Sequence, residues 1–227
     1  VHDALIPSEI IKEASPNCQI IYVGKRAGCS SFLQTDINEL LFKLSQQGKS
    51  VVRLKGGDPF VFSRGGEEVS FLESKGVKIE IVPGITSGIA APSYIGIPLT
   101  HRDGASSVTF VTGHEHMDKK EKTVKWRELA KSSDSLVIYM GIRNIEYIVK
   151  ELLQGGMDKD TACAVVQEAT LKNQKSEIST LSDLVEMINL KQFKPPSIII
   201  IGKIVKFQVC NYITKLSNAK LASIKKN

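Results

Sequence analysis

The sequence predicts an α/β protein built from two α/β domains, and three observations lead to this fold class. Short β-branched runs alternate with stretches of helical periodicity along the chain. Parallel neighbouring strands need crossover connections, so this alternation favours much parallel pairing. A charged stretch without glycine, Met117–Lys131, follows a glycine-rich first half and precedes a half with fewer glycines. We therefore expect an N-terminal domain over residues 1–114 and a C-terminal domain over residues 115–227.

Before residue 107 the chain contains three predicted strands and three predicted helices. The pattern over residues 36–47 is the clearest helix, because four apolar residues recur on one face and Gly48 follows as a stop. Residues 66–75 show the same arrangement, with Gly76 at the end. In chain order, these elements are the strand Gln19–Val23, the helix Asp36–Gln47, the strand Val51–Lys55, the helix Gly66–Lys75, the strand Val77–Val82 and the helix Thr86–Ile95.

From residue 107 onwards the alternation continues with four strands and three helices, and the first of these strands falls within the expected N-terminal domain. Trp126 stands among Lys and Arg residues, and we interpret it as a helix residue that anchors the charged stretch rather than as an RNA-stacking side chain. The predicted strands are Ser107–Thr112, Ser135–Met140, Ala162–Val166 and Ser197–Ile201, and the predicted helices are Val124–Lys131, Asn144–Gln154 and Ser182–Asn189.

The composition argues against several classes of protein. Apolar residues make up 42% of the 227 residues and charged residues 24%, which argues against a disordered chain and against a disulfide scaffold. No apolar run reaches the ~18–20 residues of a membrane-spanning helix, and no cationic leader is visible. We therefore expect no membrane association and a cytoplasmic location, with an organelle of a eukaryote as the alternative. The net charge of +6 suits an anionic small molecule and is too diffuse to indicate nucleic acid.

Neither the cysteines nor the histidines form a metal-binding pattern. The four cysteines have no C-x-x-C spacing, and we expect them to be reduced and mostly buried. His114 and His116 could face one way on a strand, but no third or fourth ligand accompanies them. We therefore predict no metal site and a hydrogen-bonding role in a loop for these histidines.

The window from Arg53 to Glu68 carries the first candidate binding site. A β-run ends in Gly56-Gly57-Asp58, and a helix begins soon afterwards. Two consecutive glycines let the backbone approach a ligand at the carboxyl end of a strand, which is where open α/β sheets bind ligands. Asp58 could accept hydrogen bonds from a hydroxyl or ammonium group, and a plain Gly-Asp-Pro turn is the alternative.

A phosphate-binding loop does not fit the sequence. Gly48-Lys49-Ser50 resembles the end of such a loop, but Lys43 stands where the pattern needs a glycine. The segment also follows a predicted helix, whereas a phosphate loop follows a strand. The dinucleotide pattern G-x-G-x-x-G occurs nowhere in the chain.

A second turn, Val82-Pro83-Gly84, leads into a helix that contains several small residues. Small side chains permit close approach either by a ligand or by a neighbouring element, and the sequence leaves both interpretations open. Thr100-His101-Arg102 then presents polar groups after an apolar turn.

Together these segments resemble the tetrapyrrole methylase family. The resemblance rests on three motifs in this order: KGGDPFVFSRGGEE, VPGITSGIAAPSYIGIPLTHRD and VTGHE. The segment from Asp3 to Gly28 is similar to the same family, while Tyr139–Gly141 and Val165–Thr170 match it more loosely. The resemblance covers roughly Asp3 to Lys206.

The resemblance implies two α/β domains, a homodimer, and S-adenosyl-L-methionine bound in a cleft between the domains. It also assigns Asp3 as the proton acceptor and Lys25 as the proton donor. The family begins with a strand and a Gly-Pro-Gly loop upstream of Asp3, which this sequence does not contain. Ser63 stands where glycine is usual, and Gln167-Glu168-Ala169 replaces Glu-Arg-Gly. The residues placed at the cofactor are Gly56, Gly57, Asp58, Val61, Thr86, Ser87, Met140 and Ala169.

The substrate that the resemblance implies is uroporphyrinogen III, methylated at C2 and C7 to give precorrin-2 in sirohaem or cobalamin biosynthesis. The carboxylates of this molecule would favour cationic side chains, and Lys25, Arg26, Arg64 and Arg102 are candidates. Two alternatives stay open: a methylase of a later precorrin, and a non-catalytic remnant that binds the cofactor.

Overall fold

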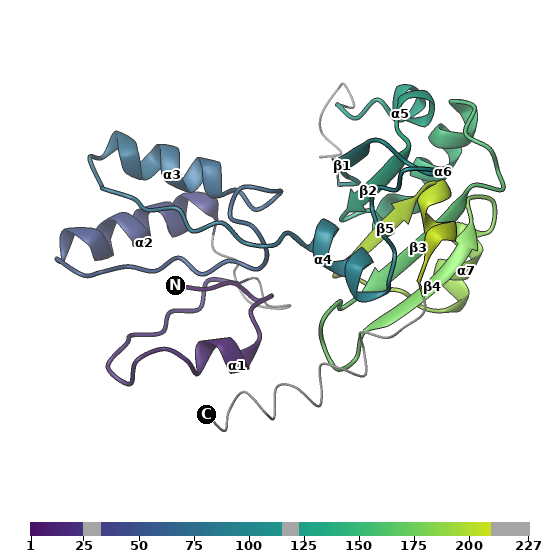
Figure 1. Ribbon diagram of the computed structural model, residues 1–227. Helices are drawn as coiled ribbons and strands as arrows, with labels where there is room; N and C mark the ends of the chain where they lie inside the picture. Colours follow the sequence, from purple (N-terminus) through teal and green to yellow (C-terminus); the bar gives the residue numbers. More distant parts are fainter. Residues whose placement is uncertain (25–32, 115–122, 210–227) are drawn as a thin grey trace. The chain divides into compact units, whose positions relative to one another are not determined.

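The computed structural model describes residues 1–24, 33–114 and 123–209. The chain forms two compact units, Val1–Thr86 and Ser87–Asn227 (Figure 1). This division precedes the predicted boundary at residue 114, because strand β1 (Val108–Thr112) pairs with β2 (Ser135–Tyr139) and therefore belongs to the second unit. The predicted α/β class is confirmed. Within the described residues, no helix is long and apolar enough to cross a membrane.

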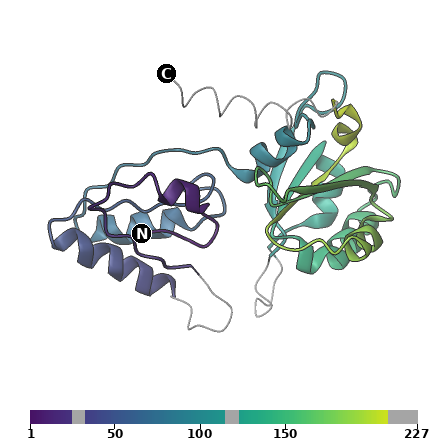
Figure 2. The ribbon, with the colours of Figure 1, turned by 90° about the horizontal axis from the view of Figure 1, so that it is seen from below.

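The first unit combines three helices with extended segments. Its helices are α1 (Ser8–Ile11), α2 (Gln34–Gln46) and α3 (Gly65–Ser74), and the last two lie side by side (Figures 1 and 2). The segments predicted as strands at 19–23, 51–55 and 77–82 contain no strand. The reason is that pairing is limited to isolated parallel bridges, from His2 to Tyr22 and from His2 to Leu54.

A small apolar core holds the first unit together. Val23, Ile37 and Leu41 are buried in it, and Val51 and Leu72 pack against them. The apolar face of α2 that the periodicity predicts is thus the face that meets the core. The carboxylate of Asp36 accepts a hydrogen bond from the Leu33 N–H at 2.9 Å and thereby fixes the start of this helix.

The second unit contains a five-stranded sheet in the order β1-β2-β5-β3-β4. Strands β3 (Ala162–Gln167), β4 (Lys175–Thr180) and β5 (Ser197–Ile201) join the two already given. Only β1 and β2 are parallel, and the other three pairs are antiparallel. The expectation of much parallel pairing is therefore wrong for this sheet. A short connection turns β3 into β4 as a hairpin, and β5 inserts between β2 and β3.

Helices cover both faces of this sheet. Alternate residues of the central strands, including Leu136, Ile138 and Ile199, pack into one buried cluster with α5 (Trp126–Ser132), α6 (Ile145–Gln154) and α7 (Leu184–Leu190). The other face meets α4 (Ser87–Tyr94), which contacts β2 and β5 (Figure 2). Because both faces are covered, β2 is buried along its whole length. Two short 3-10 helices, η1 (Ile142–Asn144) and η2 (Lys203–Phe207), complete the unit.

Trp126 and the cysteines can be placed within this fold. Trp126 begins α5 and is buried in the core of the second unit, as a helix anchor should be. Cys163 is buried in β3, and burial raises the pKa of its thiol. Cys18 is exposed, so the expectation of burial is wrong for this residue. Cys29 and Cys210 lie outside the described residues.

Candidate active site

The Gly-Gly-Asp loop follows the extended segment 51–55 in the first unit, as the sequence predicts. Gly57 has a φ of +81°, a left-handed conformation that strongly favours glycine. A Cβ on Gly84 would collide with the carbonyl of Gly57, so the second predicted turn packs directly against this loop. Gly56 and Gly57 are both exposed, which leaves their backbone groups accessible.

Asp58 joins these two turns. Its Oδ1 accepts hydrogen bonds from the N–H groups of Phe60 at 2.8 Å and Val61 at 3.1 Å, and its Oδ2 accepts from Gly84 at 3.3 Å. The Phe60 bond is the main cause that lowers the pKa of Asp58 below its ordinary value of 3.8. The hydrogen bonds to the Asp58 carboxylate therefore stabilise the folded loop at pH values above the ordinary pKa. This contribution is lost as the pH falls through the lowered pKa of the folded state. Asp58 thus has a structural role in the loop itself.

A second group of predicted cofactor residues lies at one edge of the sheet in the second unit. Tyr139 of β2 and Val166 of β3 are both paired with Ile198 of β5, so these two strands end at the same level. Both strands run antiparallel to β5, so they share one direction. Met140 follows β2 and Ala169 follows β3 shortly after, which brings their backbones to this common edge.

Backbone strain marks the same positions. Non-glycine residues with positive φ are uncommon and collect at functional sites. Five of the six in the described part of the chain lie at, or within three positions of, the predicted cofactor residues Val61, Met140 and Ala169. The six are Phe62, Arg64, Met140, Glu168, Thr170 and Gln192.

The start of α4 is tied to the end of β2. The N–H of Gly88, in the first turn of α4, donates to the phenolic oxygen of Tyr139 at 2.8 Å in a buried position. The first amides of a helix have no partner inside it, so this bond satisfies one of them. Ser87, the first residue of α4, is therefore held near the sheet edge that carries Met140.

We expect Tyr139→Phe to lower the free energy of unfolding of the second unit by about 1–3 kcal/mol, because the buried Gly88 amide loses its acceptor. Urea unfolding followed by the fluorescence of Trp126, the single tryptophan of the chain, measures this change. Tyr94→Phe is the matched control, since Tyr94 is 37% exposed and should change stability by less than about 0.5 kcal/mol. Equal values for the two variants would contradict the expectation.

Asp3, the predicted proton acceptor, directly follows His2, which forms the bridges to Tyr22 and Leu54. A Cβ on Gly24 would collide with the backbone of Ala4, and a Cβ on Gly56 would lie 3.6 Å from Leu5. The chain around Asp3 therefore runs between Gly24 and the Gly-Gly-Asp loop. Lys25, the predicted proton donor, lies outside the described residues.

The Asp3 carboxylate belongs to a charged network that the sequence reasoning missed. Its Oδ1 accepts from Arg53 Nη2 at 2.6 Å. Arg53 Nε donates to Glu68 Oε1 at 3.2 Å, and Lys55 Nζ donates to both Glu68 oxygens at 3.0 Å. The side chains of Arg53, Lys55 and Glu68 are only 13%, 7% and 5% exposed.

A signal for this network was present in the sequence. Arg53 and Lys55 stand two positions apart in an extended segment, so they share one face. Glu68 lies in the same motif, close to the start of the following helix. Two cations on one face and a nearby carboxylate indicate a group of ion pairs, although the same pattern is equally typical of separate charged side chains on the surface.

The cations proposed for substrate carboxylates differ in their surroundings. Arg64 pairs with Glu67 through two hydrogen bonds of 2.8 and 2.6 Å, and both side chains are more than half exposed. Arg102 is exposed in the turn that His101 closes with Ala105. Lys25 and Arg26 lie outside the described residues.

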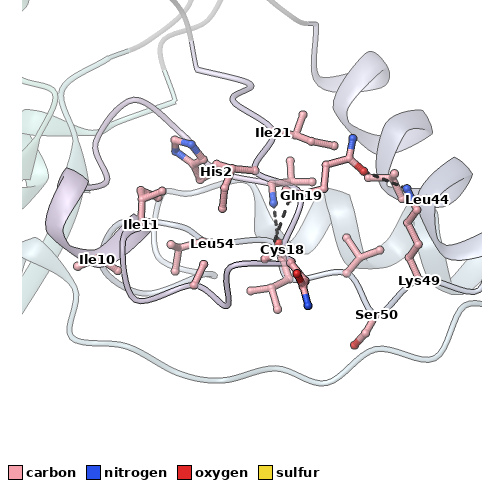
Figure 3. Close-up of a pocket in the computed structure, with 16 residues that line it drawn as sticks. His2, Ile10, Ile11, Cys18, Gln19, Ile21, Leu44, Lys49, Ser50 and Leu54 are labelled. Atoms are coloured by element: carbon pink, nitrogen blue, oxygen red, sulfur yellow. Dashed lines mark hydrogen bonds between the residues drawn. The ribbon is translucent and has the colours of Figure 1, made fainter.

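A separate hollow of about 540 Å³ lies in the first unit (Figure 3). Apolar side chains such as Ile10, Ile11 and Leu44 line it, and Lys49 donates to the side chain of Gln19 at its rim. None of the predicted cofactor residues lines this hollow. The candidate site is therefore defined by the loops and not by this cavity.

An accessible glycine loop in an α/β fold, together with the Asp3 carboxylate held by Arg53 in the same unit, is typical of an enzyme that acts on a small molecule. Residues 3–185 match the model of the tetrapyrrole (corrin/porphyrin) methylase family. The chain belongs to this family, and the resemblance seen in the sequence is confirmed.

Individual relatives agree with this assignment. The chain is 49% identical over 206 residues to the uroporphyrinogen-III C-methyltransferase of Methanocaldococcus jannaschii, covering 90% of this chain and 84% of that protein. The crystal structure of the Thermus thermophilus uroporphyrin-III C-methyltransferase with S-adenosyl homocysteine is 34% identical, with a TM-score of 0.76 and coverage of 91% and 85%. A cobalt precorrin-4 methyltransferase aligns with a TM-score of 0.78 at 25% identity, covering 89% and 83%.

Proposed function

We propose that this chain transfers methyl groups from S-adenosyl-L-methionine to C2 and C7 of uroporphyrinogen III, giving precorrin-2. The observation that carries the proposal is the 49% identity over 90% of the chain to a protein named for methylation of this substrate. A methylase of a later precorrin is less favoured, because the likeness to the precorrin-4 enzyme is 25%. A cytoplasmic location and the sirohaem or cobalamin pathway are part of the same proposal.

The residues fit this cofactor. Gly56 and Gly57 are exposed and carry no side chain, so a ligand can approach their backbone closely. Met140 is 49% exposed, and its soft thioether suits contact with an adenosyl group. We propose that Gly56, Gly57, Val61, Thr86, Ser87, Met140 and Ala169 contact S-adenosyl-L-methionine, with Asp58 shaping the loop and presenting its remaining lone pairs.

Bound S-adenosyl-L-methionine supplies a sulfonium methyl group, which is already a strong electrophile. The chain must then mainly align the pyrrole carbon with this methyl group, which corresponds to roughly 7–11 kcal/mol of the barrier at best. As the new carbon–carbon bond forms and the carbon–sulfur bond breaks, the ring must lose a proton. Asp3 accepts it, and Lys25 supplies a proton elsewhere on the macrocycle. Arg102 and Arg64 attract the substrate carboxylates.

Incubation with enzymatically made uroporphyrinogen III and methyl-labelled S-adenosyl-L-methionine tests the proposal. The expected product carries two labelled methyl groups. Labelling of a later precorrin, with none of uroporphyrinogen III, would favour the alternative methylase. Cofactor binding without any methyl transfer would favour the non-catalytic remnant.

We expect Gly56→Ala to weaken the binding of S-adenosyl-L-methionine by about tenfold or more, because the added methyl group occupies the space of the approaching ligand. The fold should tolerate this change, since a Cβ at Gly56 meets only ordinary contacts. Gly57→Ala is a poorer test because of its φ of +81°. Calorimetry measures the affinity, and Gly66→Ala serves as the control because a Cβ there meets nothing within 4 Å. Unchanged affinity in Gly56→Ala would remove this loop from the cofactor site.

We further propose that the chain forms a homodimer, which the family resemblance supports. Sedimentation equilibrium at micromolar concentration should then give about twice the chain mass of 24.9 kDa. A mass near that of one chain would contradict this proposal.

A further inference from the structure

Arg53 is bonded through all three nitrogens of its guanidinium group. Nη2 donates to Asp3 at 2.6 Å, Nε donates to Glu68 at 3.2 Å, and Nη1 donates to the carbonyl of Leu54 at 3.2 Å. A planar guanidinium held at three points has little freedom to rotate. The side chain is therefore a rigid connection between two carboxylates, one half-buried and one buried.

Glu68 anchors the other end of this connection. Its Oε1 accepts from Gln34 of α2 at 3.1 Å as well as from Arg53 and Lys55. Glu68 itself lies on α3, so the network joins α2 and α3 to the extended segment 51–55. Because three elements hold the carboxylate of Glu68, the guanidinium that it binds is fixed relative to the whole unit.

The two oxygens of Asp3 are in different situations. Among the residues that the structure describes, Oδ1 accepts the hydrogen bond from Arg53, and Oδ2 accepts none. The side chain is 33% exposed. One oxygen is thus held in place while the other stays available to take up a proton.

We infer that Arg53 is a positioning residue for methyl transfer, which acts by orienting the Asp3 carboxylate and is itself fixed by Glu68. The inference rests on the proposed function, in which Asp3 accepts the ring proton. Lysine cannot replace arginine here, because a single ammonium nitrogen at the end of a flexible stem cannot bridge Asp3 and Glu68 in a fixed geometry.

Arg53→Lys tests this role while it keeps the positive charge beside Glu68. The expected result is a loss of roughly 10²-fold in kcat, because a displacement of a catalytic group by about 1 Å lowers the rate by this factor. The cofactor affinity and the KM for the tetrapyrrole should not change. Turnover is expressed per cofactor-binding site measured by calorimetry, so that loss of folded protein is not counted as loss of kcat. Arg127→Lys is the control, because Arg127 forms an exposed pair with Glu151 in the second unit.

The double variant Asp3→Asn/Arg53→Lys separates positioning from a merely structural effect. If Arg53 acts through Asp3, the second substitution lowers kcat little beyond the loss in Asp3→Asn alone. Equal losses from Arg53→Lys in both backgrounds would overturn the inference, and so would full kcat in Arg53→Lys. Full kcat in Asp3→Asn would overturn the proton-acceptor role and the inference with it. Absence of methyl transfer in the parent chain would instead overturn the proposed function on which both rest.

Discussion

Glu68→Gln is expected to lower the free energy of unfolding of the first unit by about 3–5 kcal/mol, the cost of breaking a buried ion pair by removing one partner. The Glu68 side chain is 5% exposed and accepts hydrogen bonds from both Arg53 and Lys55. A neutral amide at this position leaves these two partly buried cations with Asp3 as their remaining anion in the network. The substitution conserves size, so the loss would reflect charge and hydrogen bonding rather than a cavity.

The neighbouring residue provides a matched control. Glu67 lies on the same helix and pairs with Arg64, but its side chain is 55% exposed. Glu67→Gln should therefore change stability by only about 0–1 kcal/mol. Hydrogen exchange of amides in residues 1–86 is the suitable measurement, since Trp126 lies in the second unit. Similar losses in both variants would show that the Glu68 network does not stabilise the unit.

The helices α2 to α7 were predictable from the sequence because each depends on a local pattern, whereas α1 (Ser8–Ile11) was not predicted. The apolar face of α2 meets the core of the first unit, and the predicted helix at 66–75 appears as α3 with nearly the same bounds. The central strands β2, β3 and β5 are buried β-branched runs, which stand out in composition alone.

The predictions of strands failed where backbone pairing between strands, and not amino-acid composition, decides the structure. Strand β4 was missed because its sequence KSEIST contains one apolar residue. It forms a strand because its backbone pairs with β3 at the edge of the sheet. The antiparallel pairing of β5 also departs from the expected parallel pairing, since a run of isoleucines fits a parallel and an antiparallel neighbour equally well. The segments 19–23 and 51–55 have the right composition but pair only through isolated bridges, and the segment 77–82 forms no bridge with the described residues.

The candidate site also has one part that the sequence predicted and another part that it did not. The Gly-Gly-Asp loop was predictable because a left-handed residue after a β-run calls for glycine. One partner of Asp58, however, is the amide of Gly84, which lies 26 positions further along the chain. Arg53 and Glu68 were missed because polar residues are usually exposed, and only the fold shows that Glu68 is buried and Arg53 partly buried.

Asp3→Asn is expected to lower the rate of methyl transfer by about 10²–10⁴-fold, the contribution typical of a residue that transfers a proton. Asparagine keeps an oxygen that can accept the hydrogen bond from Arg53, which is 2.6 Å long in the parent chain, so the side chain stays oriented. The amide, however, cannot take up a proton. Cofactor affinity should not change, because the glycine loop remains intact. Single-turnover transfer of a labelled methyl group measures the rate, and Asp160→Asn, at an exposed position of the second unit, serves as the control. Turnover within about threefold of the parent would mean that alignment suffices and that Asp3 is not the proton acceptor.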